Sequence, residues 1–369
     1  MAKIGIISFL NLDILDNGGK IRSYNIAKEL NETHEVFLLM PNIKGINPRK
    51  CINLNVLRLE DQKKDYLRKY ISFILRGIKF FRNKKVDILI CESLWTLPVG
   101  AIISRFLKIP LILNEQNLEY LRSIRLKKYI RFLYSTFLEF LLIQICDYVL
   151  CVSKYEKKIL EKILNKNIKC VLLPNGTPSI PSKKELAKKK FYRKSILDKY
   201  NISNEKLISI FVGDLTYSPN VQALKILDRI AKKYHKLISI IIIGKISNTN
   251  LRVKHENLIF TGFVENLNKF LYGADFTIIP IEEGGGTNLK IFEALAVGLP
   301  IVTSKYVLRN IDFNDNPYIL LADDNYDEKV ENVIKRLNNF QYKRTINQSY
   351  NWKYRIKNLL DVLNFDKNN

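Results

Sequence analysis

One continuous segment, Ile278–Ser304, has the sequence IIPIEEGGGTNLKIFEALAVGLPIVTS. Its apolar beginning predicts a buried strand, its three consecutive glycines predict a loop, and the residues after them predict a helix. Leu289, Phe292 and Leu295 recur at helical spacing, so they form the face that packs on a sheet. Gly298 marks the end of the helix, and the apolar residues that follow predict a second strand. This strand, loop, helix and strand form the repeating unit of a parallel α/β sheet.

The glycine loop also has the properties of an anion site. It brings bare backbone N–H groups to the positive end of a helix, where phosphate groups bind well. Lys290 can neutralise a diphosphate, and Glu293, three residues later, can accept hydrogen bonds from two ribose hydroxyls. In the alternative interpretation, the glycines form only a tight turn and the two charged residues form a surface ion pair. The predicted nucleotide-binding residues of this segment are Gly284, Gly285, Gly286, Thr287, Asn288, Leu289, Lys290 and Glu293.

The sequence GGGTNLKIFEALAVGLPIV closely resembles the nucleotide-sugar-binding segment of retaining glycosyltransferases with the GT-B fold, the family 4 group, and its GGGT–Leu-Lys–EA subset. In that family the glutamate of the EA pair holds the ribose of the donor, and Glu293 matches it. A second glutamate, eight residues earlier, usually contacts the donor sugar, but Gly285 stands there in this chain. The resemblance therefore leaves the sugar contact to Glu283 or to the amides of the loop.

The same alternation of strands and helices continues on both sides of Pro174-Asn175-Gly176, a sequence that resembles the end of the first domain in this family. A chain of 369 residues is long enough for two domains. The strand-like segments before that point are Lys3–Leu10, Val36–Met40, Val86–Cys91, Pro110–Asn114, Tyr148–Ser153 and Ile168–Leu173. Those after it are Leu207–Gly213, Ile238–Gly244, Leu258–Gly262, Phe276–Pro280, Pro300–Ser304 and Tyr318–Leu321.

We therefore predict an α/β protein of the GT-B fold, with two facing Rossmann-like, doubly wound domains. Residues 1–174 form the acceptor-side domain, and residues 175–345 form the nucleotide-sugar-binding domain. Residues 346–369 contain a C-terminal helix that returns to the first domain, as the resemblance implies.

Polar residues follow several predicted strands of the first half, and ligands bind at the carboxyl ends of parallel strands. Gly18, Gly19 and Lys20 follow the first strand at a helix start. The resemblance implies that they face the cleft and bind the donor, because the matching loop of the family touches the donor phosphates or the acceptor. The alternative is a simple turn with a solvated lysine. The segment NEQNLEY resembles the family's D-E-H-N-x-E, in which a histidine lies near the donor sugar; Gln116 takes that place and Asn117 follows it.

The resemblance implies catalytic positions for Gln116, Asn117 and Glu283. Glutamine can donate a hydrogen bond but cannot shuttle protons, which puts any role that depends on the histidine in doubt. Retention of configuration is implied by the resemblance, because in this family the phosphate of the donor is thought to accept the proton of the acceptor.

Three further strand ends in the second half are predicted to contact the donor. Gly213 ends the first of its strands, near the place where many relatives carry an arginine and a lysine for the diphosphate. This chain lacks both, and we expect Lys245 to substitute for them. Gly262, Phe263 and Val264 resemble the loop that cradles the nucleotide base through its backbone.

The net charge of +24 indicates an anionic partner or a compositional bias of the source, because most of the basic residues are lysines. Two basic amphipathic segments, Asp65–Arg82 and Leu121–Arg131, carry interfacial aromatic residues typical of helices that bind an anionic membrane. The alternative is that each is an ordinary helix with a solvated lysine face. No nucleic-acid motif accompanies the charge, so no specific nucleic-acid partner is expected.

Metal and cofactor sites are not predicted. The five cysteines lack a CxxC pair, and the three histidines are scattered. The nucleotide diphosphate-sugar is a substrate, so we expect neither a cofactor nor a metal. With no signal peptide and no spanning helix in the sequence, we expect the protein in the cytoplasm, either free or bound to the inner face of the cell membrane.

These features predict a glycosyltransferase that moves a sugar from a nucleotide diphosphate-sugar to a hydroxyl of a glycan or lipid-linked acceptor, in the synthesis of cell-envelope polysaccharide or glycolipid. A first alternative is a GT-B protein that binds a nucleotide sugar without transferring it, or a phosphorylase or epimerase. A second alternative is a nucleic-acid-binding protein that uses the same positive charge.

Overall fold

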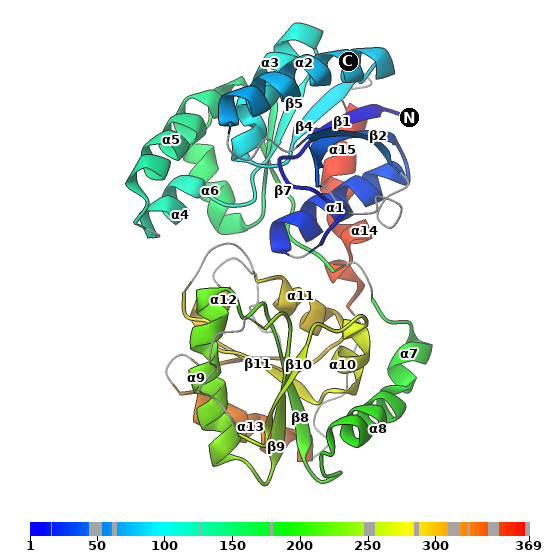
Figure 1. Ribbon diagram of the computed structural model, residues 1–369, viewed down its shortest axis with the longest axis vertical. Helices are drawn as coiled ribbons and strands as arrows, with labels where there is room; N and C mark the ends of the chain where they lie inside the picture. Colours follow the sequence, from blue (N-terminus) through cyan, green and yellow to red (C-terminus); the bar gives the residue numbers. More distant parts are fainter. Residues whose placement is uncertain are drawn as a thin grey trace. The chain divides into compact units, whose positions relative to one another are not determined.

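A computed structural model describes residues 1–15, 17–43, 54–60, 65–125, 127–177, 180–246, 255–283, 288–308, 318–322, 325–338 and 347–365. These residues form two compact units, each built around one parallel sheet (Figure 1). The first unit runs from Met1 to Asn175 and also contains the chain from Trp352 onward. The second unit contains the described residues between Gly176 and Asn351.

The first unit contains a seven-stranded parallel sheet with the order β3-β2-β1-β4-β5-β6-β7. Strands β4, β5 and β6 are buried along their whole length and are apolar except for Asn114 at the end of β5, as expected for a sheet covered by helices on each side. The strands are β1 (Lys3–Ile7), β2 (Glu35–Asn42), β3 (Asn55–Glu60), β4 (Ile88–Cys91), β5 (Leu111–Asn114), β6 (Tyr148–Cys151) and β7 (Lys169–Leu172).

Helices cover both faces of this sheet and divide its core into two layers. One layer contains apolar residues of α1 (Gly18–Asn31), α14 (Trp352–Arg355) and α15 (Lys357–Phe365). The other layer contains apolar residues of α2 (Tyr66–Lys84), α3 (Leu97–Leu107), α5 (Tyr129–Phe140) and α6 (Lys154–Ile163). Right-handed crossovers explain this division. The connection from β1 to β2 through α1 and the connection from β3 to β4 through α2 run in opposite directions across the sheet, so the two helices lie on opposite faces. The remaining helices of this unit are α4 (Glu119–Arg125), η2 (Leu94–Thr96) and η3 (Leu142–Ile145).

The second unit contains a six-stranded parallel sheet with the order β10-β9-β8-β11-β12-β13. One continuous apolar core joins the strands to the surrounding helices. The strands are β8 (Leu207–Val212), β9 (Ile238–Ile243), β10 (Leu258–Gly262), β11 (Phe276–Ile279), β12 (Ile301–Thr303) and β13 (Ile319–Leu321). The helices are α7 (Lys183–Ala187), α8 (Lys189–Tyr200), α9 (Ser218–Lys233), α10 (Leu267–Gly273), α11 (Leu289–Ala296), α12 (Lys305–Leu308), α13 (Tyr326–Asn338) and η4 (Gln348–Tyr350).

Both sheets reverse their direction of growth at their first strand. The reversal lies between β1 and β4 in the first unit, and between β8 and β11 in the second. At such a switch point the loops after the two strands diverge, which leaves a crevice at the carboxyl ends of the strands. Each unit therefore has one place in which its fold favours ligand binding.

The structure confirms the predicted fold class, with two Rossmann-like parallel α/β domains. The C-terminal helix packs on the first unit, where the Asn358 side chain donates a hydrogen bond to the carbonyl of Leu172, at 3.0 Å. The sequence analysis missed β3, an edge strand whose residues are mostly half-buried or exposed. Its polar and charged residues hide the strand pattern, because only one side of an edge strand is paired.

Two basic segments of the chain form interrupted helices. The lysine-rich segment from Ser182 to Tyr200 forms α7 and α8, which are separated at Lys188. The basic segment Leu121–Arg131 spans the end of α4 and the start of α5, with Lys127 between them in a left-handed conformation at φ 53°. A continuous amphipathic helix is therefore absent there. Within the described ranges, no helix is both long and apolar enough to span a bilayer.

Candidate functional site

The switch point of the second unit contains five of the predicted donor-binding residues, Gly213, Asn288, Leu289, Lys290 and Glu293. The glycine loop itself, Gly284, Gly285, Gly286 and Thr287, lies outside the described residues. The structure describes the chain on both sides of it, with Glu283 after β11 and with Asn288 and Leu289 at the start of α11. Lys290 and Glu293 follow in the first turns of that helix.

Lys290 lies half-buried and points toward the adjacent strand β8 and helix α9. Its Nζ donates a hydrogen bond to Oδ1 of Asn220 at 3.1 Å, and it lies 4.4 Å from the centroid of the Phe211 ring. Burial lowers the pKa of Lys290 to about 7, against the opposing effect of the nearby Glu293 carboxylate. An added anion in contact with this ammonium group would therefore gain a strong electrostatic interaction.

Glu293 is half-buried as well, one helical turn from Lys290. Among the residues that the structure describes, it forms neither an ion pair with Lys290 nor a hydrogen bond to another side chain. Burial raises the pKa of Glu293 to about 7, and the attraction of Lys290 opposes this rise. The surface ion pair considered from the sequence therefore does not form. The Glu293 carboxylate stays available to a ligand, and the Lys290 ammonium group, which donates one hydrogen bond to Asn220, has two further donors.

Asn220, in the first turn of α9, holds Lys290 in place. Its amide nitrogen donates to the carbonyl of Asp214 at 2.8 Å, while its amide oxygen accepts from Lys290. Gly213 makes this arrangement possible, because a Cβ at that position would lie 2.9–3.0 Å from the Asn220 amide atoms. The sequence analysis named Gly213 but did not assign a role to Asn220.

The other predicted donor contacts lie at the carboxyl ends of neighbouring strands. The amide of Gly244 donates to the carbonyl of Gly262 at 2.9 Å, which ties the end of β9 to the end of β10. Gly262 has a φ of 72°, and Phe263, which follows it, is 82% exposed. Val264 is half-buried against the core. Lys245 is exposed and makes no side-chain hydrogen bond or ion pair within the described part of the chain.

Glu283 is exposed and follows β11. Its Oε1 accepts a hydrogen bond at 2.7 Å from Nε2 of Gln222, a residue of α9. The side chain is thus held against α9, and Glu283 directly precedes the glycine loop in sequence. Its predicted catalytic role stays a prediction.

The switch point of the first unit contains the start of α1. Asn17 caps this helix by accepting a hydrogen bond from the amide of Lys20, at 3.1 Å, and Gly18 is its first residue. Gly19 lies against Gln116: a Cβ on this glycine would be 2.8 Å from the glutamine Oε1. The structure therefore brings the predicted loop and the predicted Gln116 together.

A buried polar network joins these residues to Glu92, which follows β4. Oε2 of Glu92 accepts hydrogen bonds from Ser23 at 2.6 Å and from Asn114 at 2.8 Å. Nε2 of Gln116 donates to the hydroxyl of Ser23 at 3.0 Å. Burial raises the pKa of Glu92, and the hydrogen bonds from Ser23 and Asn114 oppose this effect. Asn117 lies just outside this network, and its backbone interacts with the Glu115 carboxylate.

Arg22 extends the network toward the end of the first unit. Its guanidinium group donates to Asn114 at 2.8 Å and to Asn175 at 2.9 Å, and it lies 5.8 Å from the centroid of the Trp352 ring. Burial lowers the pKa of Arg22 to about 10, so the side chain stays charged at neutral pH. Arg22 thus connects α1 to Asn114 at the end of β5, to Asn175 and to Trp352 in the C-terminal segment.

Family models match both units of the chain. The model described as Glycosyltransferase Family 4 matches residues 17–179, and the model described as Glycosyl transferases group 1 matches residues 206–339. The chain carries the two domains of a GT-B glycosyltransferase. The first glycosyltransferase domain contains the Glu92 network, and the second contains Lys290 and Glu293.

Solved structures with the same fold include glycosyltransferases from several bacteria. A glycosyltransferase from Rickettsia africae has a TM-score of 0.76 and 14% identity, over 100% of this chain and 99% of that chain. Sucrose-phosphate synthase from Thermosynechococcus elongatus has a TM-score of 0.73 and 14% identity, over all of both chains. Anabaena HepE, in complex with UDP and glucose, has a TM-score of 0.73 and 13% identity, over 99% of this chain and 100% of that chain. No curated protein sequence matches the chain.

Three residues of the two glycosyltransferase domains were not predicted as site residues from the sequence. They are Arg22, Ser23 and Asn220, whose side chains position Asn114, Gln116 and Lys290. The only sequence signal for them is their place in the first turns of helices that follow a strand and a glycine. Within the described ranges, no group of histidine, cysteine and carboxylate side chains has the arrangement of a metal site.

Proposed function

We propose that the protein transfers a sugar from a nucleotide diphosphate-sugar to a hydroxyl group of a glycan or lipid-linked acceptor. One observation carries this proposal: Lys290 and Glu293 lie half-buried and unpaired with each other at the switch point of the second glycosyltransferase domain. In this arrangement Lys290 neutralises the diphosphate and Glu293 accepts hydrogen bonds from the ribose hydroxyls.

The same cation favours the chemical step. As the bond between the sugar and the phosphate breaks, negative charge accumulates on the departing nucleoside diphosphate. A cation that already lies in a partly dry site, held by Asn220, stabilises this charge without reorganisation of solvent. In the retaining mechanism that we propose, a phosphate oxygen of the donor accepts the proton of the attacking hydroxyl. This mechanism requires neither a metal nor a histidine, which agrees with Gln116 in the place of the family's histidine.

The nature of the nucleotide is a further part of the proposal. Structures of HepE, which has a similar fold, contain UDP with glucose or UDP-glucose. Uridine is therefore the first base to test. The exposed Phe263 and the open conformation of Gly262 provide a surface on which a base can lie, with the backbone available for hydrogen bonds.

A peripheral location on an anionic membrane, with an acceptor of the cell envelope, also belongs to the proposal. Helix α2 exposes a stripe of Leu67, Ile71 and Leu75, which lie one turn apart. Arg68 and Lys79 are exposed beside this stripe, and the helix contains no acidic residue. Neutralising Arg68 and Lys79 should reduce cosedimentation with phosphatidylglycerol vesicles, and unchanged cosedimentation would contradict this location.

Thermal stabilisation by nucleoside diphosphates tests the donor site directly. A ligand at a hundred times its dissociation constant should stabilise the protein by about 2.7 kcal/mol. We expect a shift with one nucleotide that is lost in Glu293→Ala and in Lys290→Ala, and kept in Lys269→Ala, which removes an exposed lysine of α10 in the same unit. The absence of a shift with every nucleotide would contradict the proposal.

A nucleotide-sugar-binding protein without transfer activity is the second candidate. The Gln116 amide, which already donates to Ser23, favours this candidate because it offers no group that can carry a proton. Release of the nucleoside diphosphate that depends on an added glycan or lipid-linked acceptor would establish transfer. Saturable binding without release of the nucleotide would establish the second candidate.

A further inference from the structure

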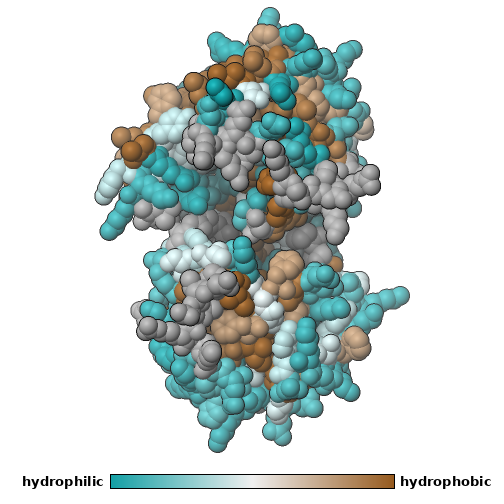
Figure 2. Space-filling view, in the orientation of Figure 1, coloured by the Kyte–Doolittle hydropathy of each residue, from teal (hydrophilic) through white to brown (hydrophobic). Residues whose placement is uncertain are grey.

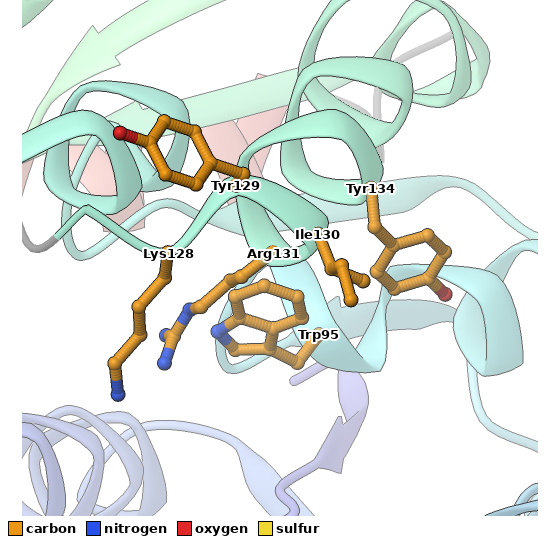
Figure 3. Close-up of a pocket in the computed structure, with 6 residues that line it drawn as sticks. All are labelled: Trp95, Lys128, Tyr129, Ile130, Arg131 and Tyr134. Atoms are coloured by element: carbon orange, nitrogen blue, oxygen red, sulfur yellow. The ribbon is translucent and has the colours of Figure 1, made fainter.

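The first unit contains a second candidate site, a pocket of about 1030 Å³ at the start of α5. Figure 3 shows that Lys128 and Arg131 extend in the same direction beside the indole of Trp95, while Tyr129 points away from them. The pocket is lined by Trp95, Lys128, Tyr129, Ile130, Arg131 and Tyr134. None of these residues belongs to the donor site of the second unit.

Aromatic and cationic groups are combined in this pocket. The rings of Trp95 and Tyr134 are stacked, with centroids 6.0 Å apart and planes at 28°. Arg131 covers the indole at 4.6 Å and donates to Glu119 at 2.7 Å, so its position is fixed. Lys128 is exposed, and its ammonium group has no acceptor within the described ranges. The pocket thus offers two stacked aromatic rings and one cation without an acceptor among the described residues.

The apolar lining continues as an exposed face of α5. Ile130 is 87% exposed and Leu133 is 68% exposed, and further large apolar residues follow along the helix. These further residues are Phe137, Phe140 and Leu141. In Figure 2, brown surface extends over the helical layer of the first unit that contains α2, α3 and α5 (Figures 1 and 2). A contiguous apolar surface of this kind is unfavourable in water and indicates an apolar ligand or partner.

The pocket lies in the predicted acceptor-side domain, next to the strand that carries Glu92 at its end. Trp95 belongs to η2, which directly follows β4 and the network residue Glu92. Trp95 therefore follows the carboxyl end of β4, one of the two strands at the switch point of the first unit. A ligand held against Trp95 lies close to the residues that we assign to the acceptor side.

We propose that this pocket binds the anionic headgroup of a lipid-linked acceptor, with the alkyl chain of the lipid on the exposed face of α5. Lys128 pairs with the headgroup, Trp95 and Tyr134 contact its sugar or its first methylene groups, and Ile130 and Leu133 contact the chain. Charge complementarity and the stacked aromatic rings select an anionic amphiphile over a neutral glycan. This inference rests on the proposed function, because it names the class of acceptor for that reaction.

Tryptophan fluorescence tests the inference with dodecyl phosphate as the probe, below its critical micelle concentration. The chain has two tryptophans, and Trp352 is fully buried, so a ligand-induced change reports Trp95. We expect saturable binding that is about tenfold weaker in Lys128→Glu. Ile130→Ser should also weaken it. Lys162→Glu, at an exposed lysine of α6, is the matched control and should bind normally. The signal should disappear in Trp95→Phe.

Three competing ligands separate the possible sources of binding. Dodecyl maltoside has the same alkyl chain without the charge, and inorganic phosphate has the charge without the chain; we expect each to bind far more weakly than dodecyl phosphate. Equal binding of either one would overturn the inference. Complete competition by phosphatidylglycerol vesicles would assign the pocket to bulk membrane lipid and would also overturn it. Because nucleotide stabilisation depends on the second unit, normal nucleotide binding without dodecyl phosphate binding would reject this inference alone.

Discussion

The two units of this protein share a strand order around their switch points but use it differently. In the first unit, Glu92 is buried and accepts hydrogen bonds from Ser23 and Asn114. In the second unit, Lys290 and Glu293 are only half-buried, and burial moves the pKa of each to about 7. The first switch point thus supplies its own hydrogen-bond partners. At the second, Lys290 donates to the neutral Asn220 amide, and neither Lys290 nor Glu293 forms an ion pair within the described ranges.

The first network therefore stabilises the fold, whereas the second cluster is suited to binding a charged ligand. A buried polar group with native partners fixes the elements that carry it, and its removal leaves those partners unsatisfied. A half-buried charge without a partner stabilises the fold little, but it gains a strong interaction when an opposite charge arrives. Substitutions in the first network should therefore reduce stability, and substitutions in the second cluster should reduce ligand binding.

The largest expected effect is that of Glu92→Ala in the first network. The substitution leaves Ser23 and Asn114 without their buried acceptor, and we expect a loss of about 3 kcal/mol in the stability of that unit. Differential scanning calorimetry should show a melting temperature lower by about 6–12 °C.

Glu92→Gln provides the matched control for that experiment. Its carbonyl oxygen can accept both hydrogen bonds, while its amide takes the place of Oε1, a buried atom without a hydrogen-bond partner among the described residues. We expect a loss of about 1 kcal/mol or less. A melting temperature unchanged in Glu92→Ala would show that the network does not support the unit.

The second expected effect is that of Lys290→Met on nucleotide binding. Removal of the cation should weaken binding of the nucleoside diphosphate by about thirtyfold, or about 2 kcal/mol. The melting temperature of the free protein should stay the same or rise, because a partly desolvated charge is replaced by an apolar side chain. Isothermal titration calorimetry and thermal scanning measure the two quantities. A large loss of stability in Lys290→Met would show that the second cluster, like the first network, stabilises its unit.

The pH dependence of nucleotide binding should sharpen the comparison further. The pKa of Lys290 is about 7 in the free protein, and a bound diphosphate raises it, so binding takes up a proton above pH 7. The affinity should therefore fall as the pH rises above 7, by up to about tenfold per unit. Arginine stays protonated throughout this range, so Lys290→Arg should abolish the decrease. The same decrease in that variant would assign the proton to another group.

The sequence contains enough information for the fold and for the local part of the donor site. Lys290 and Glu293 could be predicted because one helix carries both of them behind a glycine loop, and helical spacing fixes their separation. The Arg22 network could not be predicted, because Arg22 and Asn175 are 153 residues apart and meet only after the sheet has formed. Asn220 shows the same limit: its contact with Lys290 spans 70 residues, and nothing in its own segment indicates it.

The smallest expected effects come from one alanine substitution at a matched glycine in each unit. A Cβ at Gly19 would lie 2.8 Å from Oε1 of Gln116, the end of a flexible side chain, whereas a Cβ at Gly213 would lie 2.9–3.0 Å from three atoms of the Asn220 amide. Gln116 donates a side-chain hydrogen bond to Ser23 and can rotate away at a cost of about 1 kcal/mol, which reduces the stability of the first unit slightly. Gly19→Ala should therefore leave nucleotide affinity in the second unit unchanged.

Asn220 has less freedom, because its amide holds the carbonyl of Asp214 and the ammonium group of Lys290 at the same time. Gly213→Ala should therefore displace Lys290 and weaken nucleotide binding by about three- to tenfold, with a change in melting temperature similar to that of Gly19→Ala. Titration of both variants with the same nucleotide measures the difference. Equal affinities would mean that Asn220 does not position Lys290, and that the second switch point binds its ligand without the support of α9.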